Sequence, residues 1–136
     1  MRFVDTNVLL YAISHRPDEG AKAARARTLL RSRDLACSAQ VLQEFVVQAT
    51  HVRHGADAMP RADAAGFVHA MTRFPVQPIT ASLVLAALDT STRWQISYWD
   101  AAIVEAARAL GCAELLSEDL QPGMDFDGVR VVNPFA

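Results

Sequence analysis

The chain has 136 residues, of which 51% are hydrophobic and 21% are charged, and its formal net charge at pH 7 is -2. A chain of this length is expected to fold as one domain over residues 1–136 and to bury roughly two-thirds of the surface that its unfolded form exposes. No apolar stretch approaches the ~20 residues that span a bilayer, and the N-terminus lacks a secretory signal pattern. These features exclude a membrane-spanning chain and lead us to expect a cytoplasmic protein.

The N-terminal half of the chain predicts two short strands, each followed by helices. The apolar run at residues 2–4 predicts a strand, and the Asp-Thr-Asn sequence at residues 5–7 supplies N-cap chemistry for a helix. Further along, Ser38 can cap a helix that Gly55 would end. In order, we expect a strand at 2–4, a helix at 8–14, a turn at 16–20, a helix at 21–33, a strand at 35–38 and a helix at 40–54.

The C-terminal half predicts three helices and two strands. Two prolines, Pro75 and Pro78, keep the connection at 74–79 out of a central strand unless that strand is very short. In order, we expect a helix at 60–73, an extended connection at 74–79, a helix at 81–93, a helix capped by Ser97 and ended by Gly111, and strands at 113–116 and 129–132. This alternation predicts an α/β fold with a mostly parallel sheet of four to five short strands flanked by helices.

Four carboxylates occupy places where a parallel sheet can bind a ligand. Asp5 and Asp119 each follow a predicted strand, and Glu44 and Asp100 lie in the first turns of predicted helices. Ligands of such sheets bind beyond the carboxyl ends of the strands, near which those helices would begin. If the four carboxylates meet there, they form an all-oxygen site suited to Mg²⁺ or Mn²⁺. The pattern therefore suggests a metal-dependent phosphodiester hydrolase, a hypothesis that fails if the carboxylates stay apart.

Each carboxylate also has a purely structural interpretation. Asp5 can be the N-cap of the first helix, and Glu44 a solvated residue of a later one. Asp100 matches the acid of a Ser-x-x-Asp capping box. Asp119 can begin a turn, and the neighbouring Glu118 is a rival for its role as a ligand. Taken singly, the four sites leave both interpretations open.

The charge distribution is compatible with a phosphate backbone as partner. Residues 1–33 carry seven Lys or Arg against three Asp or Glu, whereas residues 111–136 carry one Arg against five acids. Divalent ions bound by the four candidate carboxylates would cancel much of the acidic charge. The metal-bound protein would then be mildly cationic, which favours association with nucleic acid.

The order and spacing of the carboxylates also match a known family. The segments concerned are Asp-Thr-Asn-Val-Leu-Leu-Tyr-Ala at 5–12, Gln-Glu-Phe at 43–45, Tyr-Trp-Asp-Ala-Ala-Ile-Val at 98–104 and Leu-Ser-Glu-Asp at 116–119. Together they resemble the PIN-domain ribonucleases, and within them the VapC-type toxins of bacterial toxin–antitoxin pairs. The resemblance covers essentially the whole chain, and its most specific parts are the opening segment and the segment around Asp100.

The resemblance implies a three-layer PIN-like fold, a Mg²⁺-dependent endoribonuclease that acts as a toxin, homodimers, and inhibition by a small antitoxin protein. Carried onto this chain, it implies a catalytic, metal-binding set and three supporting polar residues. The set is Asp5, Glu44, Asp100 and Asp119, and the supporting residues are Thr6, Asn7 and Ser117. Glu118 stands where many relatives have a smaller polar residue, which leaves open whether Glu118 or Asp119 faces the metal.

Two other functions fit parts of the pattern. One is a non-catalytic PIN-like binding module that docks a protein or RNA partner. The other is a small-molecule phosphatase with Asp5 as nucleophile, although the chain has Asp-Thr-Asn in place of an Asp-x-Asp pair. Trp94, Tyr98 and Trp99 are candidates to stack a nucleobase beside the pocket, with core packing as the alternative.

Other metal-ligating residues give weaker patterns. His51 and His54 have a helical spacing that can hold zinc, but the sequence nearby offers no cysteine or third histidine. Cys37 and Cys112 lack CxxC spacing and are expected to be two buried thiols in a cytoplasmic setting.

Overall fold

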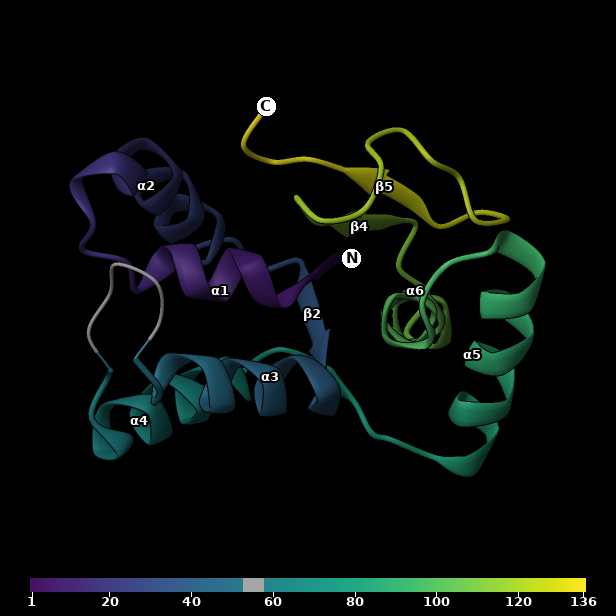
Figure 1. Cartoon of the computed structure of the whole chain (residues 1–136), viewed down its shortest axis with the longest axis horizontal. Coiled ribbons are helices and arrows are strands. Elements are labelled where there is room, and N and C mark those ends of the chain that lie inside the picture. Colours follow the sequence, from purple (N-terminus) through teal and green to yellow (C-terminus); the bar gives the residue numbers. More distant parts are fainter. Residues whose placement is uncertain (53–57) are drawn as a thin grey trace.

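The computed structural model describes residues 1–52 and 58–136 of the chain, and its strands and helices alternate as the sequence predicts (Figure 1). The elements in order are β1 (Arg2–Val4), α1 (Thr6–Ala12), the 3-10 turn η1 (Pro17–Glu19), α2 (Gly20–Leu29), β2 (Leu35–Ser38), α3 (Ala39–Ala49), α4 (Arg61–Met71), β3 (Val76–Gln77), α5 (Ala81–Trp94), α6 (Tyr98–Ala109), β4 (Glu114–Leu116) and β5 (Arg130–Val132).

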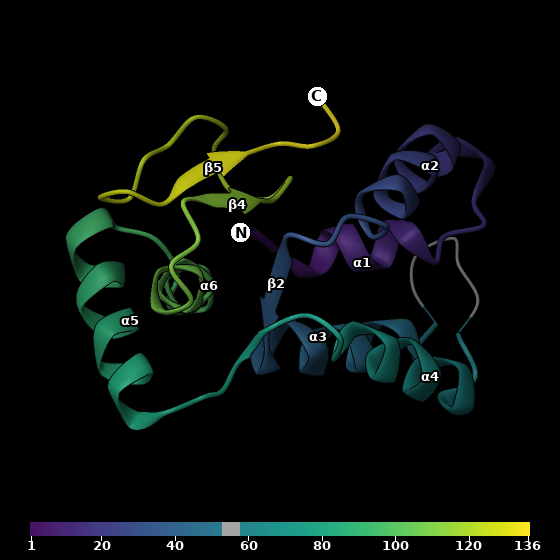
Figure 2. The same cartoon turned by 180° about the vertical axis from the view of Figure 1, so that it is seen from behind.

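The five strands form one parallel sheet in the order β3-β2-β1-β4-β5. The chain first moves outward from β1 to β3, then returns past β1 to reach β4. Because crossovers between parallel strands are right-handed, this reversal places the later helices on the opposite face. Accordingly, α1 to α4 lie on one side of the sheet and α5 and α6 on the other (Figures 1 and 2). The predicted three-layer α/β class is confirmed.

The core lies on both faces of the central strands. Phe3, Val4, Leu35 and Leu115 are each completely or almost completely buried. A parallel sheet that is covered on both faces requires continuous apolar runs, whereas a half-exposed sheet requires alternation. This is why the strands of this chain appear in the sequence as short uninterrupted apolar segments.

Local chemistry explains where several elements begin and end. The side chain of Ser38 accepts a hydrogen bond from the Val41 amide at the start of α3, and Ser97 caps α6 in the same way. The predicted stop of α3 at Gly55 is outside the described residues, and the helix itself ends earlier, at Ala49. The extended connection with two prolines contributes only the two-residue strand β3, at an edge of the sheet.

Two further expectations from composition can be compared with the structure. Cys37 and Cys112 are both free and buried, as predicted, and burial raises the pKa of the Cys37 thiol to about 11. In residues 1–52 and 58–136, no helix has the length and apolar content needed to cross a bilayer.

Candidate metal centre

All four predicted carboxylates line a single pocket of about 380 Å³. Asp5 follows β1 and Asp119 lies just beyond β4, the neighbouring strand, while Glu44 is in α3 and Asp100 is in the first turn of α6. The pocket therefore forms where the carboxyl ends of two central strands meet the beginnings of two helices. Parallel α/β sheets bind their ligands at this kind of edge.

Asp5 is the most enclosed of the four carboxylates, with 6% of its surface exposed. Its Oδ1 accepts a hydrogen bond from the Thr6 amide at 2.7 Å, and its Oδ2 accepts one from the Ser117 hydroxyl at 2.7 Å. Desolvation, together with the charges of Asp119 and Glu44, raises the pKa of Asp5 to about 6, while the hydrogen bonds from Ser117 and Thr6 oppose the rise. Asp5 is thus both the N-cap of α1 and an acid of the pocket, so its two interpretations are compatible.

Glu44 is held by two donors. The Thr6 hydroxyl donates to one carboxylate oxygen at 2.7 Å, and the Gln40 side-chain amide donates to the other at 2.9 Å. Gln40 also donates to the backbone carbonyl of Trp99 at 3.2 Å, which joins α3 to the start of α6. The interpretation of Glu44 as a solvated helix residue is therefore wrong, because its carboxylate is half-buried and bonded to residues of two elements.

Asp100 is half-buried at the N-terminal turn of α6, where its backbone amide donates to the Ser97 hydroxyl at 3.1 Å. Desolvation raises the pKa of the Asp100 carboxyl, and the charges of Asp119 and Glu44 add to this effect, while a hydrogen bond with Ser97 opposes it. As with Asp5, a helix-capping position and a place in the pocket are occupied by the same residue. The mutual repulsion of these acids favours any ligand that brings positive charge.

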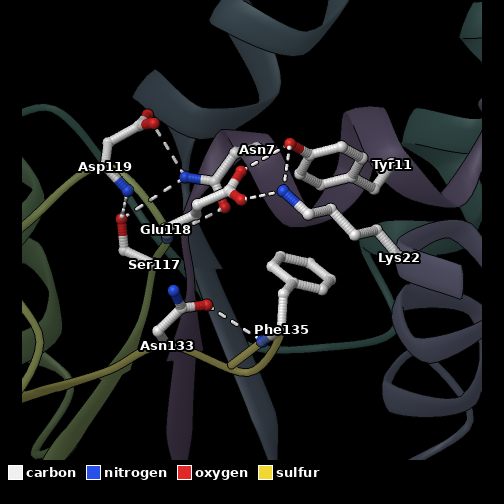
Figure 3. A network of polar contacts seen from close by, with 8 residues as sticks. All are labelled: Asn7, Tyr11, Lys22, Ser117, Glu118, Asp119, Asn133 and Phe135. Atoms are coloured by element: carbon white, nitrogen blue, oxygen red, sulfur yellow. Dashed lines mark hydrogen bonds and ion pairs between the residues drawn. The ribbon is translucent and has the colours of Figure 1, made fainter. Parts of the chain in front are cut away.

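Asp119 and Glu118 are adjacent in sequence but have different partners (Figure 3). Asp119 accepts a hydrogen bond from the Asn7 side-chain amide at 3.2 Å. The Glu118 carboxylate accepts one from the Tyr11 hydroxyl at 2.5 Å and forms an ion pair with Lys22. Desolvation alone would raise the pKa of Glu118, but hydrogen bonds from Lys22 and Tyr11 outweigh it and hold that pKa below its usual range.

The three predicted supporting residues connect these carboxylates to one another. Thr6 binds both Asp5 and Glu44, through its amide and its hydroxyl. Ser117 is completely buried, and its hydroxyl donates to Asp5 while accepting from the Asp119 amide at 3.1 Å. Asn7 donates to both Ser117 and Asp119, so one chain of hydrogen bonds runs from α1 to the end of β4.

Three further residues of the site were not predicted from the sequence to belong to it. Gln40 lies four residues before Glu44, a spacing that places two side chains together on a helix and that points to this contact. Tyr11 and Lys22 come from α1 and α2, and no local pattern links them to Glu118. Only the packing of α1 and α2 against the end of β4 makes that contact.

The donor set fits a hard divalent cation, because the pocket is lined by the four predicted acids together with Glu19 and Glu118, and Mg²⁺ and Mn²⁺ prefer oxygen ligands. Within the described residues, no group of three or more His, Cys, Asp or Glu stands in a ready-made coordinating arrangement. For the alternative zinc pair, His51 is exposed and its Nδ1 lies 2.5 Å from the Val47 carbonyl oxygen, while His54 is outside the described residues.

The three aromatic candidates have different environments. Trp94 packs edge-on against Phe126, with ring centroids 5.3 Å apart. Tyr98 is half-buried and packs against a small buried cluster of three alanines, Ala87, Ala101 and Ala102. Trp99, by contrast, is 65% exposed and lines the carboxylate pocket. Two of the three aromatics thus serve packing, and Trp99 alone of these three faces the pocket.

Solved structures with a similar fold include a toxin–antitoxin complex and a toxin, and no curated protein matches the chain. A toxin–antitoxin complex from Klebsiella pneumoniae aligns with a TM-score of 0.72 and 19% identity over 98% of both chains. The Sarcin–Ricin loop cleaving toxin VapC20 of Mycobacterium tuberculosis aligns with a TM-score of 0.67 and 22% identity, over 88% of this chain and 92% of the other. FitAcB from Neisseria gonorrhoeae aligns with a TM-score of 0.62 and 18% identity over 99% of both chains.

At these identities the solved structures establish a shared fold. The family itself is established by the sequence, because the PIN domain matches residues 2–122, which include the four predicted carboxylates. The chain therefore belongs to the PIN-domain family.

Proposed function

We propose that this chain is a Mg²⁺-dependent endoribonuclease, with Mn²⁺ as a second usable cation, and that it acts as the toxin of a toxin–antitoxin pair. The observation that carries the proposal is the gathering of Asp5, Glu44, Asp100 and Asp119 around one pocket. A PIN domain over residues 2–122 supports a nuclease. The similarity of fold to a toxin described as cleaving the Sarcin–Ricin loop supports RNA as the substrate.

In this proposal Asp5 and Asp100 hold the principal cation, and Asp119 and Glu44 complete its shell or hold a second ion. A bound cation of this kind lowers the pKa of a water molecule and neutralises charge on the phosphate oxygens. The residues of the chain orient the acids: Thr6 and Ser117 fix both oxygens of Asp5. None of the described residues that line the pocket is a histidine, so the proposed chemistry uses no imidazole base.

Single-stranded RNA is the proposed substrate, and Trp99 is its proposed contact beside the cleaved bond. The exposed indole lines the carboxylate pocket and also a neighbouring groove, whose other residues are Gln40, Gln43, Glu44, Val47 and Gln48. An unpaired base can stack on such a ring, whereas a base inside a duplex is already stacked on its neighbours. The exposed Gln43 of the groove carries a side-chain amide that can both donate to and accept from a base edge.

The proposed partners are a second copy of the chain, forming a homodimer, and a small antitoxin protein. Support comes from proteins of similar fold that were solved as assemblies. One is a toxin–antitoxin complex from Klebsiella pneumoniae, and another is VapBC2 from Rickettsia felis bound to a DNA fragment from its promoter. The antitoxin would block the pocket that the RNA must enter.

Cleavage of single-stranded RNA by purified, antitoxin-free protein tests the proposal. We expect cleavage in Mg²⁺, no cleavage in EDTA, and no cleavage by an Asp100→Asn variant with unchanged circular dichroism. Asp89→Asn is the matched control, because Asp89 is an exposed aspartate on α5, outside the pocket. Cleavage by Asp100→Asn at the wild-type rate in Mg²⁺ would refute the mechanism.

A second candidate is a non-catalytic module that uses the same pocket to dock a partner. It is favoured by the repulsion among the acids of the pocket, where the charges of Asp119 and Glu44 add to desolvation in raising the pKa of Asp100, because a positively charged side chain relieves that repulsion as a cation does. A basic side chain of a partner would then take the place of the cation among the carboxylates. Tight partner binding by a protein that shows no Mg²⁺-dependent nuclease activity would support this function over the first.

A further inference from the structure

Glu118 and Asp119 follow β4 as neighbouring acids, and their side chains have different contacts. Both Glu118 and Asp119 line the pocket. Asp119 is exposed and accepts a hydrogen bond from the Asn7 side chain at 3.2 Å. The Glu118 carboxylate is engaged on both oxygens, by the Tyr11 hydroxyl and by Lys22, the only lysine of the chain. The charge of Glu118 is thus compensated by a cation of the protein itself.

Glu118 is also joined to the pocket through its backbone. The amide of Glu118 donates to the Asn7 side-chain oxygen at 3.3 Å, and the nitrogen of the same Asn7 side chain donates to Asp119 and Ser117. Asn7 therefore contacts all three residues that follow β4. Any rotation of the Glu118 peptide would break one of its bonds and misalign the others.

The partners of Glu118 are themselves fixed by the packing of α1, α2 and the C-terminal segment. The Lys22 ammonium lies over the Tyr11 ring, 5.0 Å from its centroid, and 3.3 Å from its hydroxyl. The same ring meets Phe135 at a centroid distance of 4.9 Å (Figure 3). Arg25, also on α2, donates to the Pro134 carbonyl at 3.2 Å. Tyr11 and Lys22, which anchor the Glu118 side chain, are thus held in place by the packing of α1, α2 and the C-terminal segment.

We propose that Glu118 is a positioning residue: its contact with Tyr11 and Lys22 holds residues 117–119 in the orientation that turns Asp119, and not Glu118, toward the proposed cation. This deepens the proposed function and rests on it. It also decides between the two acids that the sequence left as rivals. The physical reason is that anchoring the Glu118 side chain on α1 and α2 fixes the peptide that joins it to Asp119, and this fixes the direction in which the Asp119 side chain leaves the chain.

Two substitutions at Glu118 separate positioning from metal ligation. Glu118→Gln keeps an oxygen that accepts from Tyr11 and is the conservative variant, whereas Glu118→Ala removes the anchor. The control is Glu114→Ala, which removes a glutamate at the start of β4 that is ion-paired with Arg130 at 3.8 Å and does not line the pocket. Asp119→Asn provides the reference for loss of a ligand.

The first measurement needs neither metal nor RNA. In metal-free protein, amide hydrogen exchange at residues 117–119, with the NMR signals of the Asn7 side-chain amide, reports the order of this segment. We expect exchange about tenfold faster in Glu118→Ala, because the hydrogen bond from Tyr11 and the ion pair with Lys22 are both lost, and together they change an opening equilibrium by about that factor. We expect a smaller rise in Glu118→Gln, which keeps an acceptor for Tyr11 but loses the ion pair with Lys22, and wild-type exchange in Glu114→Ala. Unchanged exchange in Glu118→Ala would overturn the proposal.

The second measurement is a Mn²⁺ titration in the absence of RNA, followed by electron paramagnetic resonance. For a positioning residue, affinity falls about tenfold in Glu118→Ala, in proportion to the lost order, and recovers in part in Glu118→Gln, which keeps the contact with Tyr11. A loss in Glu118→Gln as large as in Asp119→Asn would instead identify Glu118 as a ligand and overturn the proposal. A wild-type protein that binds no Mn²⁺ would refute the proposed function, and the exchange result would still decide whether Glu118 orders the segment.

Discussion

Replacing the buried Asp5 by asparagine is expected to stabilise the protein at alkaline pH while it removes a proposed ligand. Asp5 is 6% exposed, and its pKa rises from an ordinary value of 3.8 to about 6, chiefly through desolvation. The folded state holds this proton more tightly than the unfolded state. The contribution of Asp5 to the free energy of unfolding therefore falls as pH rises from about 4 to 6, and it is constant above about 7. The asparagine side chain carries no charge, so this cost would disappear, together with any cation binding at this position.

The magnitude follows from the two pKa values. Ionisation of Asp5 costs the folded state about 1 kcal/mol at pH 4.5 and about 3 kcal/mol at pH 8, at about 1.4 kcal/mol per tenfold change in acidity. Asparagine retains an acceptor for the Thr6 amide but loses the acceptor of the Ser117 hydroxyl, which costs about 1 kcal/mol. We therefore expect Asp5→Asn to be neutral at pH 4.5 and more stable than wild type by about 2 kcal/mol at pH 8.

Urea unfolding in EDTA at both pH values measures this difference directly. The comparison of variant with wild type cancels the titration of distant groups, and Asp89→Asn, at an exposed position, serves as the control. A free-energy difference that is the same at pH 4.5 and pH 8, or that favours wild type at pH 8, would refute the reasoning, because it would mean that burial does not penalise the charge of Asp5.

Three other predictions follow from the same structure. Mg²⁺ at about 100 times its dissociation constant is expected to stabilise the protein by about 2.7 kcal/mol, seen as a rise in Tm that EDTA reverses; an unchanged Tm would contradict a metal site. Trp99→Ala should weaken binding of fluorescent single-stranded RNA to Asp100→Asn protein about tenfold, since stacking contributes about 1–3 kcal/mol per base; an equal loss in the packing control Trp94→Phe would argue against a specific contact. Phe45→Ala should lower the free energy of unfolding by about 3–5 kcal/mol in urea, because the ring is fully buried and stacks on Phe67 at 4.6 Å; a loss below about 1 kcal/mol would place it outside the core.

The sequence predicted elements most accurately where a structure requires one type of residue over a short segment. The strands at 2–4 and 35–38 were predicted with the bounds that the structure has, because buried parallel strands are marked by continuous apolar runs. Helix ends were less accurate. The predicted helix at 21–33 ends at Leu29, after which the amides of Arg31 and Ser32 bond to carbonyls three residues back. Tighter turns of this kind depend on local geometry more than on residue type.

By itself, the sequence determined the alternation of strands and helices, the caps at Asp5 and Ser97, and the placement of acids after the strands, because each depends on neighbours within a few residues. The tertiary structure alone decided which acids have which partners. Tyr11 and Lys22 lie 107 and 96 residues before Glu118, and contacts over such separations arise only when α1 and α2 pack beside the end of β4. The physical reason is that the direction of a side chain depends on the surface against which its segment packs. That surface is formed by residues far away in the sequence, so a local pattern does not predict it.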